Sequence, residues 1–259
     1  MSDDAARWRW AADGWVPDDD PPDGPVAAAD SWLVDAGRVR GWALHEQRFT
    51  AAAQAGGLEP AVAGAALAAA PGCVPAAGRW FPRIDWRDRV LTLAVRPAPP
   101  AEETVVAWPA DAPDPRTDPR RKGPDLERLG ALRDRAAAHG AGEAVILDAD
   151  GRPLEGAYSS LLWWEDGTLG AIDDAAPILP GVTRALLIGL AADAGVPVAR
   201  SRPALADLAA REVWLTSALH GIRAVTAWAD GPAAGPAPRA AEWQARLAAL
   251  AQPWTGRGG

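Results

Sequence analysis

The sequence of 259 residues has few of the features that mark several common classes of protein. It contains one cysteine, Cys73, so no disulfide can form within the chain. No stretch approaches the roughly 18 apolar residues that a bilayer-spanning helix requires, and the first residues lack the apolar core of a signal peptide. With a net charge of −8 and no basic segment concentrated enough to indicate nucleic-acid binding, the sequence predicts a cytoplasmic protein that binds neither nucleic acid nor anionic membranes.

Lysine is also scarce, because a single one, Lys122, stands among 26 lysine and arginine residues. Abundant Ala, Gly, Pro, Arg and Trp with no Asn indicate a GC-rich coding sequence, in which Lys drifts to Arg wherever charge alone matters. Arginine stays protonated at any biological pH, whereas lysine can lose its proton and attack a carbonyl carbon. Lys122 is therefore a candidate amine nucleophile that forms a Schiff base. The alternative is a residual surface charge in the basic run 120–122.

The pattern of apolar and turn residues predicts two domains of α/β (α+β) character. Residues 1–110 predict a small α+β domain, the Pro- and Asp-rich residues 111–121 an interdomain linker, and residues 122–259 a larger domain. The tail from Trp254 is expected to fray. Helices are expected over 44–55, 58–71, 125–139, 180–194, 205–210 and 242–250. Two strand segments joined by a turn at 35–37 are expected within 30–39. Further strands are expected around 8–15 and over 80–86, 90–96, 104–108, 144–148, 154–156, 160–164, 168–172, 196–200, 212–216 and 222–228.

Two local features of the second domain are candidate anion sites. Gly181, Val182 and Thr183 precede a predicted helix, whose free amides and dipole favour a negative charge. Thr216 and Ser217 form a hydroxyl-rich turn directly after a buried strand. The alternative for the first is an ordinary helix cap, and for the second a turn that satisfies its own backbone.

Glu155 lies inside a predicted hairpin between apolar and small residues. A carboxylate buried there needs a partner, and a protonated pyridine nitrogen would serve. The alternative is an edge-strand glutamate that faces water. A lysine, a phosphate site and a carboxylate together indicate pyridoxal 5′-phosphate more strongly than any one of them does.

The order of these motifs resembles the fold-type IV pyridoxal-phosphate enzymes, the class IV aminotransferase family, from about Asp30 to Trp228. That group includes branched-chain aminotransferases, D-amino-acid aminotransferases and 4-amino-4-deoxychorismate lyases. The motifs that carry the resemblance are His45-Glu46-Gln47-Arg48-Phe49, Lys122 with its following helix, Gly142 to Asp148 with Gly151 and Glu155-Gly156, Ile178 to Arg184, and Glu212 to Ala218.

The resemblance implies two α/β domains with pyridoxal 5′-phosphate between them, in a homodimer. It implies that Lys122 forms the internal aldimine and moves protons, and that Glu155 pairs with the pyridine nitrogen. The residues it implies for the phosphate are Arg48, Val182, Thr183, and Ser217 or Thr216.

The sequence departs from the family pattern near the cofactor. Many aminotransferases carry a tyrosine shortly after the lysine, but the only tyrosine here is Tyr158. Lyase members use a polar group near the cofactor face, and Ser31 is a candidate for that catalytic role. We therefore favour a 4-amino-4-deoxychorismate lyase-like enzyme, which would release pyruvate and 4-aminobenzoate, a reaction of folate biosynthesis. The alternatives are an aminotransferase for branched-chain or D-amino acids, and a non-catalytic partner subunit.

Overall fold

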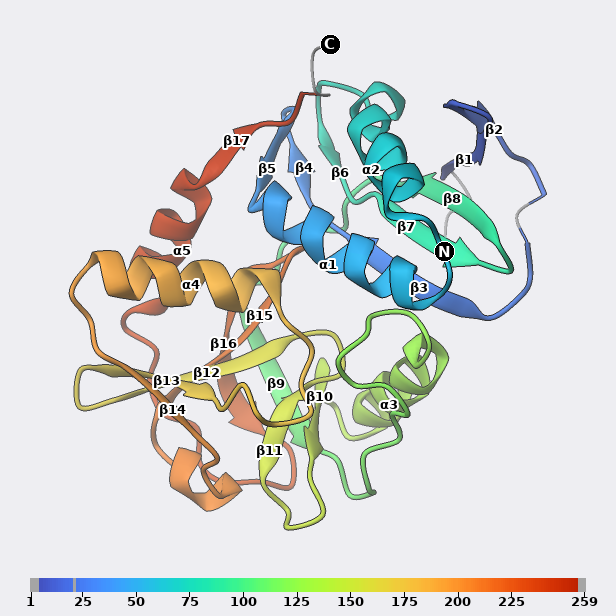
Figure 1. Cartoon of the computed structure of the whole chain (residues 1–259). Helices are drawn as coiled ribbons and strands as arrows, with labels where there is room; N and C mark the ends of the chain where they lie inside the picture. Colours follow the sequence, from blue (N-terminus) through green and yellow to red (C-terminus); the bar gives the residue numbers. More distant parts are fainter. Residues whose placement is uncertain (1–4, 21, 256–259) are drawn as a thin grey trace. The chain divides into compact units, whose positions relative to one another are not determined.

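The computed structural model describes residues 5–20 and 22–255 (Figure 1). By contacts between residues the chain divides into two compact units. Unit 1 takes the chain up to Pro100, the short segment Arg121–Pro124 and the chain from Leu250; unit 2 takes Ala101–Arg120 and Asp125–Ala249. This division differs from the predicted boundaries because the segment with Lys122 and the end of the chain both belong to unit 1.

The main sheet of unit 1 is antiparallel throughout, in the order β2-β1-β8-β7-β3. The single strand predicted around 8–15 is in fact the hairpin of β1 and β2, which turns through Ala12 at a positive φ of 53°. The strands are β1 (Ala6–Ala11), β2 (Gly14–Pro17), β3 (Val26–Ser31), β7 (Arg83–Arg87) and β8 (Val90–Val95).

Two helices cover this sheet. Helix α1 (Trp42–Ala55) packs on β3, and α2 (Pro60–Ala69) packs on α1 and ends in the short 3-10 turn η1 (Ala70–Cys73). Burial alternates along β7 and β8, as expected for a sheet with one face in a core. The core between helices and sheet includes Phe49, Ile84 and Leu93, all fully buried.

A second, four-stranded sheet of unit 1 has the order β17-β5-β4-β6. Its strands are β4 (Val34–Asp35), β5 (Arg38–Arg40), β6 (Arg79–Trp80) and β17 (Ala251–Pro253), and β17 comes from the end of the chain. The prediction that the tail frays from Trp254 is wrong for Trp254, which is 8% exposed and contacts the rings of Trp32 and Trp42. Residues 256–259 of that predicted tail lie outside the described residues.

Unit 2 contains an eight-stranded mixed sheet in the order β11-β10-β9-β16-β15-β12-β13-β14. The strand predicted at 104–108 is β9, and it runs parallel to its two neighbours, β10 and β16. Its near-continuous apolar run is typical of a strand buried on both faces. The strands are β9 (Thr104–Pro109), β10 (Glu143–Leu147), β11 (Pro153–Gly156), β12 (Ser160–Glu165), β13 (Thr168–Ile172), β14 (Val198–Ser201), β15 (Glu212–Ser217) and β16 (Gly221–Trp228).

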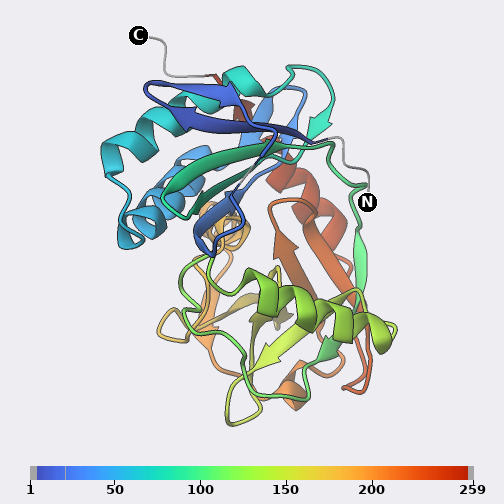
Figure 2. The ribbon, with the colours of Figure 1, turned by 90° about the vertical axis from the view of Figure 1, so that its right-hand side faces the viewer.

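The helices of unit 2 lie where the sequence predicts them. Helix α3 (Leu126–Ala138) packs on β10 (Figure 2), whereas α4 (Val182–Asp193) and α5 (Ala240–Ala249) pack together, α4 on β15 and α5 on β16. The predicted short helix at 205–210 is the 3-10 turn η2 (Leu205–Leu208). Among the described residues, no helix combines the length and the apolar character needed to cross a bilayer.

Substitution of Trp254 tests whether the end of the chain stabilises unit 1. Trp254→Ala leaves a cavity beside Trp32 and Trp42, so we expect it to lower the free energy of unfolding by about 3 kcal/mol. Val16→Ala at an exposed position is the control and should cost less than about 0.5 kcal/mol. Equal denaturant midpoints for the two variants would contradict this role of Trp254.

Candidate active site

The segment with the lone lysine is attached to the edge of the unit 1 sheet. The Ala29 amide of β3, the edge strand, donates a 2.7 Å hydrogen bond to the Lys122 carbonyl. A Cβ added at Gly123 would lie 2.8 Å from the Cα of Ala28, and Gly123 has a φ of 145°. Glycine at this position therefore allows the close backbone approach that holds Lys122 beside β3.

A buried carboxylate on the same strand organises the helix opposite. Asp30 is fully buried, and its Oδ1 lies 2.9 Å from His45 Nδ1 and 2.7 Å from an Arg48 Nη2 atom. The Arg48 Nε atom donates a 2.9 Å bond to the other oxygen, so the guanidinium contacts Asp30 at two points. Burial would raise the pKa of Asp30, but Arg48 and His45 outweigh it and hold that pKa well below its usual range. Burial lowers the pKa of His45 despite its bond to Asp30, which favours the neutral ring.

Burial and the neighbouring charges together set the protonation of Lys122. Burial lowers the pKa of the Lys122 amine to about 8, and Arg48 and Arg83 act in the same direction. Asp30 and Asp85 oppose them by favouring the ammonium ion. A substantial fraction of neutral, nucleophilic amine is therefore present near neutral pH, which an ordinary surface lysine does not offer.

Ser31 lies at the end of β3 and is buried. It is paired across the strands with Arg83, whose Nε atom donates a 2.7 Å bond to Asp85. Arg96 lies over the ring of Phe81, with 5.2 Å between the guanidinium carbon and the ring centroid. The hydroxyl proposed for the lyase role thus has an arginine as its neighbour in the sheet.

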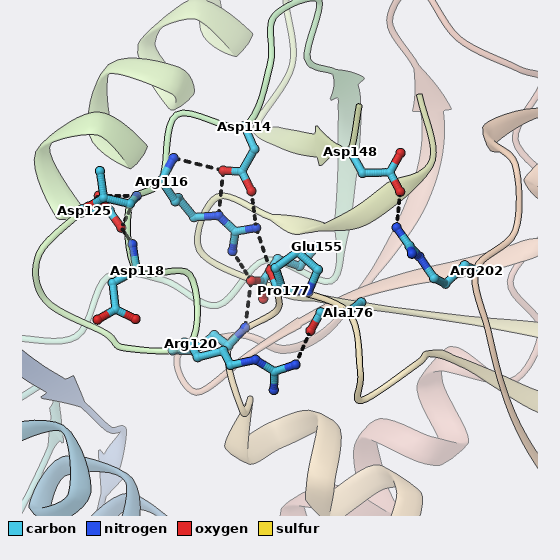
Figure 3. Close-up of polar contacts among 12 residues, drawn as sticks. Asp114, Arg116, Asp118, Arg120, Asp125, Asp148, Glu155, Ala176, Pro177 and Arg202 are labelled. Carbon is cyan, nitrogen blue, oxygen red and sulfur yellow. Dashed lines mark hydrogen bonds and ion pairs between the residues drawn. The ribbon is translucent and has the colours of Figure 1, made fainter. Parts of the chain in front are cut away.

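Glu155 is buried within β11, as the hairpin predicts. Its Oε1 atom accepts a bond from the Leu179 amide at 2.8 Å and another from Arg116 Nη1 (Figure 3). Arg116 is in turn bound to Asp114. Burial raises the pKa of Glu155 to about 7, although Arg116 and the Leu179 amide both lower it.

The two candidate anion sites are linked through Ser160. Helix α4 begins after Gly181 without a side-chain cap, so its first amides have no partner within the helix. A Cβ at Gly181 would lie 2.2 Å from the Ser160 hydroxyl oxygen, so the helix start lies directly against Ser160. Ser160 is paired with Thr216 of β15, and the Thr216 hydroxyl donates a 3.3 Å bond to the Ser160 carbonyl.

The side chains beside the two candidate anion sites are Val182 and Thr183 at the start of α4 and Ser217 at the end of β15. Thr183 is buried in the first turn of α4, together with Val182. The Ser217 hydroxyl accepts a 3.3 Å bond from the His220 amide, which is the self-satisfied turn that the sequence left as an alternative. The helix start and the Ser160 hydroxyl therefore provide donors for an anion within unit 2, whereas the single hydroxyl proton of Thr216 is already donated to the Ser160 carbonyl.

The structure brings the predicted site residues into two groups. Within unit 1, Lys122 lies near Arg48 and Arg83, while Ser31 is on the strand that Lys122 contacts. The remaining predicted residues lie in unit 2: Glu155 in β11, Val182 and Thr183 in α4, and Thr216 and Ser217 in β15.

Sequence reasoning missed three residues of these groups. Asp30, which binds Arg48, follows an Ala-rich run and could have been noticed as an acid inside a predicted strand. Asp114 and Arg116 lie in the segment predicted as a linker, where no periodicity indicates burial. That segment is bound within unit 2, since Arg120 also donates to the carbonyls of residues 174–176 at 2.8–2.9 Å.

The position of Gly123 can be tested by substitution. Gly123→Ala places a Cβ against the β3 backbone at a φ that favours glycine, and we expect a loss of about 1–3 kcal/mol or more in the free energy of unfolding. Gly140→Ala is the matched control, because Gly140 has a positive φ of 72° with open space around it. Chemical denaturation of both variants checks this. Equal losses would show that the contact with β3 is unimportant.

The protonation of Lys122 can be measured directly because the chain has one lysine. In a chain labelled with ¹³C-lysine, we expect one side-chain resonance with a titration midpoint of about 8, the amine being mostly neutral above that pH. In the urea-unfolded chain the midpoint should return to about 10.4. Arg83→Gln should raise the folded-state midpoint, because it removes a neighbouring cation and leaves Asp85 with Arg87 as its remaining ion-pair partner among the described residues. A folded-state midpoint near 10.4 would contradict the electrostatic argument.

A search of curated protein sequences gave no match. The family model described as amino-transferase class IV matches residues 27–228.

Several solved structures share the fold. A hypothetical aminotransferase from Mycobacterium tuberculosis in its apo form is 22% identical, with 95% of this chain and 98% of that chain covered and a TM-score of 0.78. Its PLP-bound form is 21% identical, with 94% and 98% covered and a TM-score of 0.76. The branched-chain amino acid aminotransferase of Escherichia coli is 18% identical, with 97% of both chains covered and a TM-score of 0.79.

The family match covers most of the chain, and the fold agrees with solved aminotransferases over nearly its whole length. The predicted enzyme class is thereby confirmed. The chain belongs to the class IV aminotransferase family and has the fold of the fold-type IV pyridoxal-phosphate enzymes.

Proposed function

We propose that this chain uses pyridoxal 5′-phosphate, with Lys122 as the amine that carries it, to act on a small substrate with an amino group. The observation that carries the proposal is the lone lysine, fixed on the edge of β3 where burial lowers the pKa of its amine and leaves it partly neutral. A surface lysine kept only for its charge would have an ordinary, high pKa. A solved relative from Mycobacterium tuberculosis is described as PLP-bound, which supports the same cofactor here.

The residues of unit 2 fit the rest of this cofactor. Among the described residues, both hydrogen bonds to the Glu155 carboxylate go to Oε1, so Oε2 is left to accept a bond from a protonated ring nitrogen. The uncapped start of α4, with Val182 and Thr183, supplies amides and a hydroxyl for a phosphate. The Ser160 hydroxyl, which lies against the start of that helix, is the third contribution to that anion site.

Bound pyridoxal phosphate supplies an electron sink that stabilises negative charge at the substrate carbon next to the nitrogen. The protein residues then have separate tasks. Lys122, once its amine is free and neutral, accepts or donates the proton at that carbon. Glu155 holds the proton on the ring nitrogen, and the α4 amides fix the phosphate end. In the folded protein Arg48 is bound to Asp30, so its contribution to phosphate binding would come from that fixed position.

We propose a lyase-like reaction on 4-amino-4-deoxychorismate as the finer assignment. Its products would be pyruvate and 4-aminobenzoate, and the gain of aromaticity helps to drive the elimination. The support is twofold. The only tyrosine, Tyr158, is 43% exposed, and Arg133 lies over its ring. In the sequence it is far from Lys122, so no tyrosine closely follows the lysine. Ser31, by contrast, is a buried hydroxyl next to Arg83, which suits a polar catalytic group and a substrate carboxylate.

The second candidate is amino-group transfer to a 2-keto acid. The observation in its favour is that the solved relatives are described as aminotransferases, including a branched-chain amino acid aminotransferase. Both reactions use the same lysine, carboxylate and anion site. They differ in what is released after the proton is removed: the lyase breaks the substrate C–O bond and expels pyruvate, whereas amino transfer releases a keto acid and keeps the amino group for an acceptor. The homodimer and the cytoplasmic location stay predictions.

Replacement of the lysine tests the cofactor assignment. Lys122→Arg keeps the charge but removes the nucleophile, so we expect loss of the yellow colour and a fall in activity of at least about 10²–10⁴-fold. Borohydride should abolish the visible absorption of the wild-type protein and fix the cofactor to a peptide containing Lys122. Arg246→Gln, at an exposed position, is the control and should remain yellow. A wild-type protein that takes up no pyridoxal phosphate would overturn the proposal.

The two reactions are distinguished on the loaded wild-type protein. Pyruvate release from 4-amino-4-deoxychorismate is measured beside keto-acid formation from a panel of branched-chain and D-amino acids. The lyase assignment requires pyruvate and 4-aminobenzoate in equal amounts with no second substrate. Keto-acid formation that depends on an added acceptor would establish the aminotransferase instead.

A further inference from the structure

An ion-paired arginine lies behind the carboxylate that faces the proposed ring nitrogen. The Arg116 side chain is 4% exposed, and its Nε and Nη2 atoms donate 2.8 Å bonds to the two oxygens of Asp114. Its Nη2 atom also donates to the Pro177 carbonyl at 2.9 Å. The remaining Nη1 atom donates to Glu155 Oε1. The guanidinium is thereby fixed at three points, and its last donor is directed at Glu155 (Figure 3).

These contacts give the two carboxylate oxygens of Glu155 different surroundings. Oε1 accepts from Arg116 and, at 2.8 Å, from the Leu179 amide. Among the residues that the structure describes, Oε2 receives no hydrogen bond. Two donors on one oxygen fix the plane of the carboxylate, and the free oxygen is the one available to a ligand.

The charge balance around Glu155 depends on this arginine. The side chain of Glu155 is 6% exposed, and burial favours its neutral acid form. Asp114 adds to that tendency as a second negative charge, whereas Arg116 and the Leu179 amide oppose it. Arg116 is the only cation among these groups. Its removal would leave two acids and one neutral donor around a buried carboxyl group.

We infer that Arg116 is a positioning residue that keeps Glu155 in its carboxylate form and turns Oε2 towards the pyridine nitrogen. The inference rests on the proposed function, because it assumes that the ring nitrogen binds at Oε2. A neutral Glu155 cannot hold a proton on that nitrogen by charge, so the ring would become a weaker electron sink. Arg116 therefore acts on the chemistry through Glu155 without touching the substrate.

The test compares Arg116→Met with the wild type and with two matched variants. Methionine preserves much of the apolar length of the side chain and removes the charge. Arg116→Lys keeps the charge but loses the planar fork that binds Asp114. Arg246→Met breaks an exposed arginine–glutamate pair elsewhere in unit 2 and serves as the control. Circular dichroism establishes that each variant is folded; should Arg116→Met fail to fold, Arg116→Lys is judged by the same criteria.

The first measurement uses the protein without cofactor and follows the infrared bands of Glu155, assigned by their loss in Glu155→Gln. We expect the wild-type carboxyl group to titrate near pH 7. In Arg116→Met the midpoint should rise by about one pH unit or more, a tenfold gain in proton affinity, with a smaller rise in Arg116→Lys. An unchanged midpoint in Arg116→Met would overturn the inference.

The second measurement is the dissociation constant of pyridoxal 5′-phosphate, read from its absorbance. Arg116→Met should bind it about 10- to 100-fold more weakly than the wild type and Arg246→Met do. If the wild type binds the cofactor and Arg116→Met binds it equally well, the inference fails and the proposed function stands. If the wild type does not bind it, the proposed function fails, and the role of Arg116 towards the ring nitrogen fails with it.

Discussion

A carboxylate that leaves water needs a cation or several hydrogen-bond donors around it, and this need organises both units of the chain. In unit 1 the buried Asp30 connects β3 to α1 through His45 and Arg48. In unit 2 Glu155 connects β11 to the segment before the lysine through Arg116. The same pairing recurs between Glu143 and Arg223 at 2.7 Å and between Glu212 and Arg239 at 3.0 Å.

The number of satisfied oxygens separates a structural acid from a candidate functional one. Asp30 accepts bonds on both oxygens and is held ionised by its two partners, so it serves as a fixed anchor for Arg48. Glu155 accepts its bonds on one oxygen and has a pKa near neutrality, so a small change in its surroundings alters its charge. Arg223, which the number of arginines alone would allow as a substrate ligand, is buried against Glu143 and has a structural role.

The sequence predicts those parts of the structure that local chemistry determines. Helix α4 follows from a Pro-Gly-x-Thr start, and the placement of Glu155 follows from the Asp150-Gly151 turn before β11. The β1–β2 hairpin was missed because its turn uses Ala12 at positive φ, where glycine or asparagine would have been the signal. The bond between Arg116 and Glu155 spans 39 positions, and no spacing rule reaches that far. The parallel partners of β9 and the return of β17 to unit 1 likewise depend on tertiary packing.

The isolation of Lys122 has a practical consequence for anyone who handles the protein. Reagents that couple to primary amines, such as succinimidyl esters used for dyes, cross-linkers and sensor surfaces, ordinarily spread over many lysines. Here one lysine carries the only side-chain amine, and its lowered pKa makes it reactive at the mildly alkaline pH of such couplings. Labelling that spreads over many side chains in most proteins would thus be directed in this one to a single side chain.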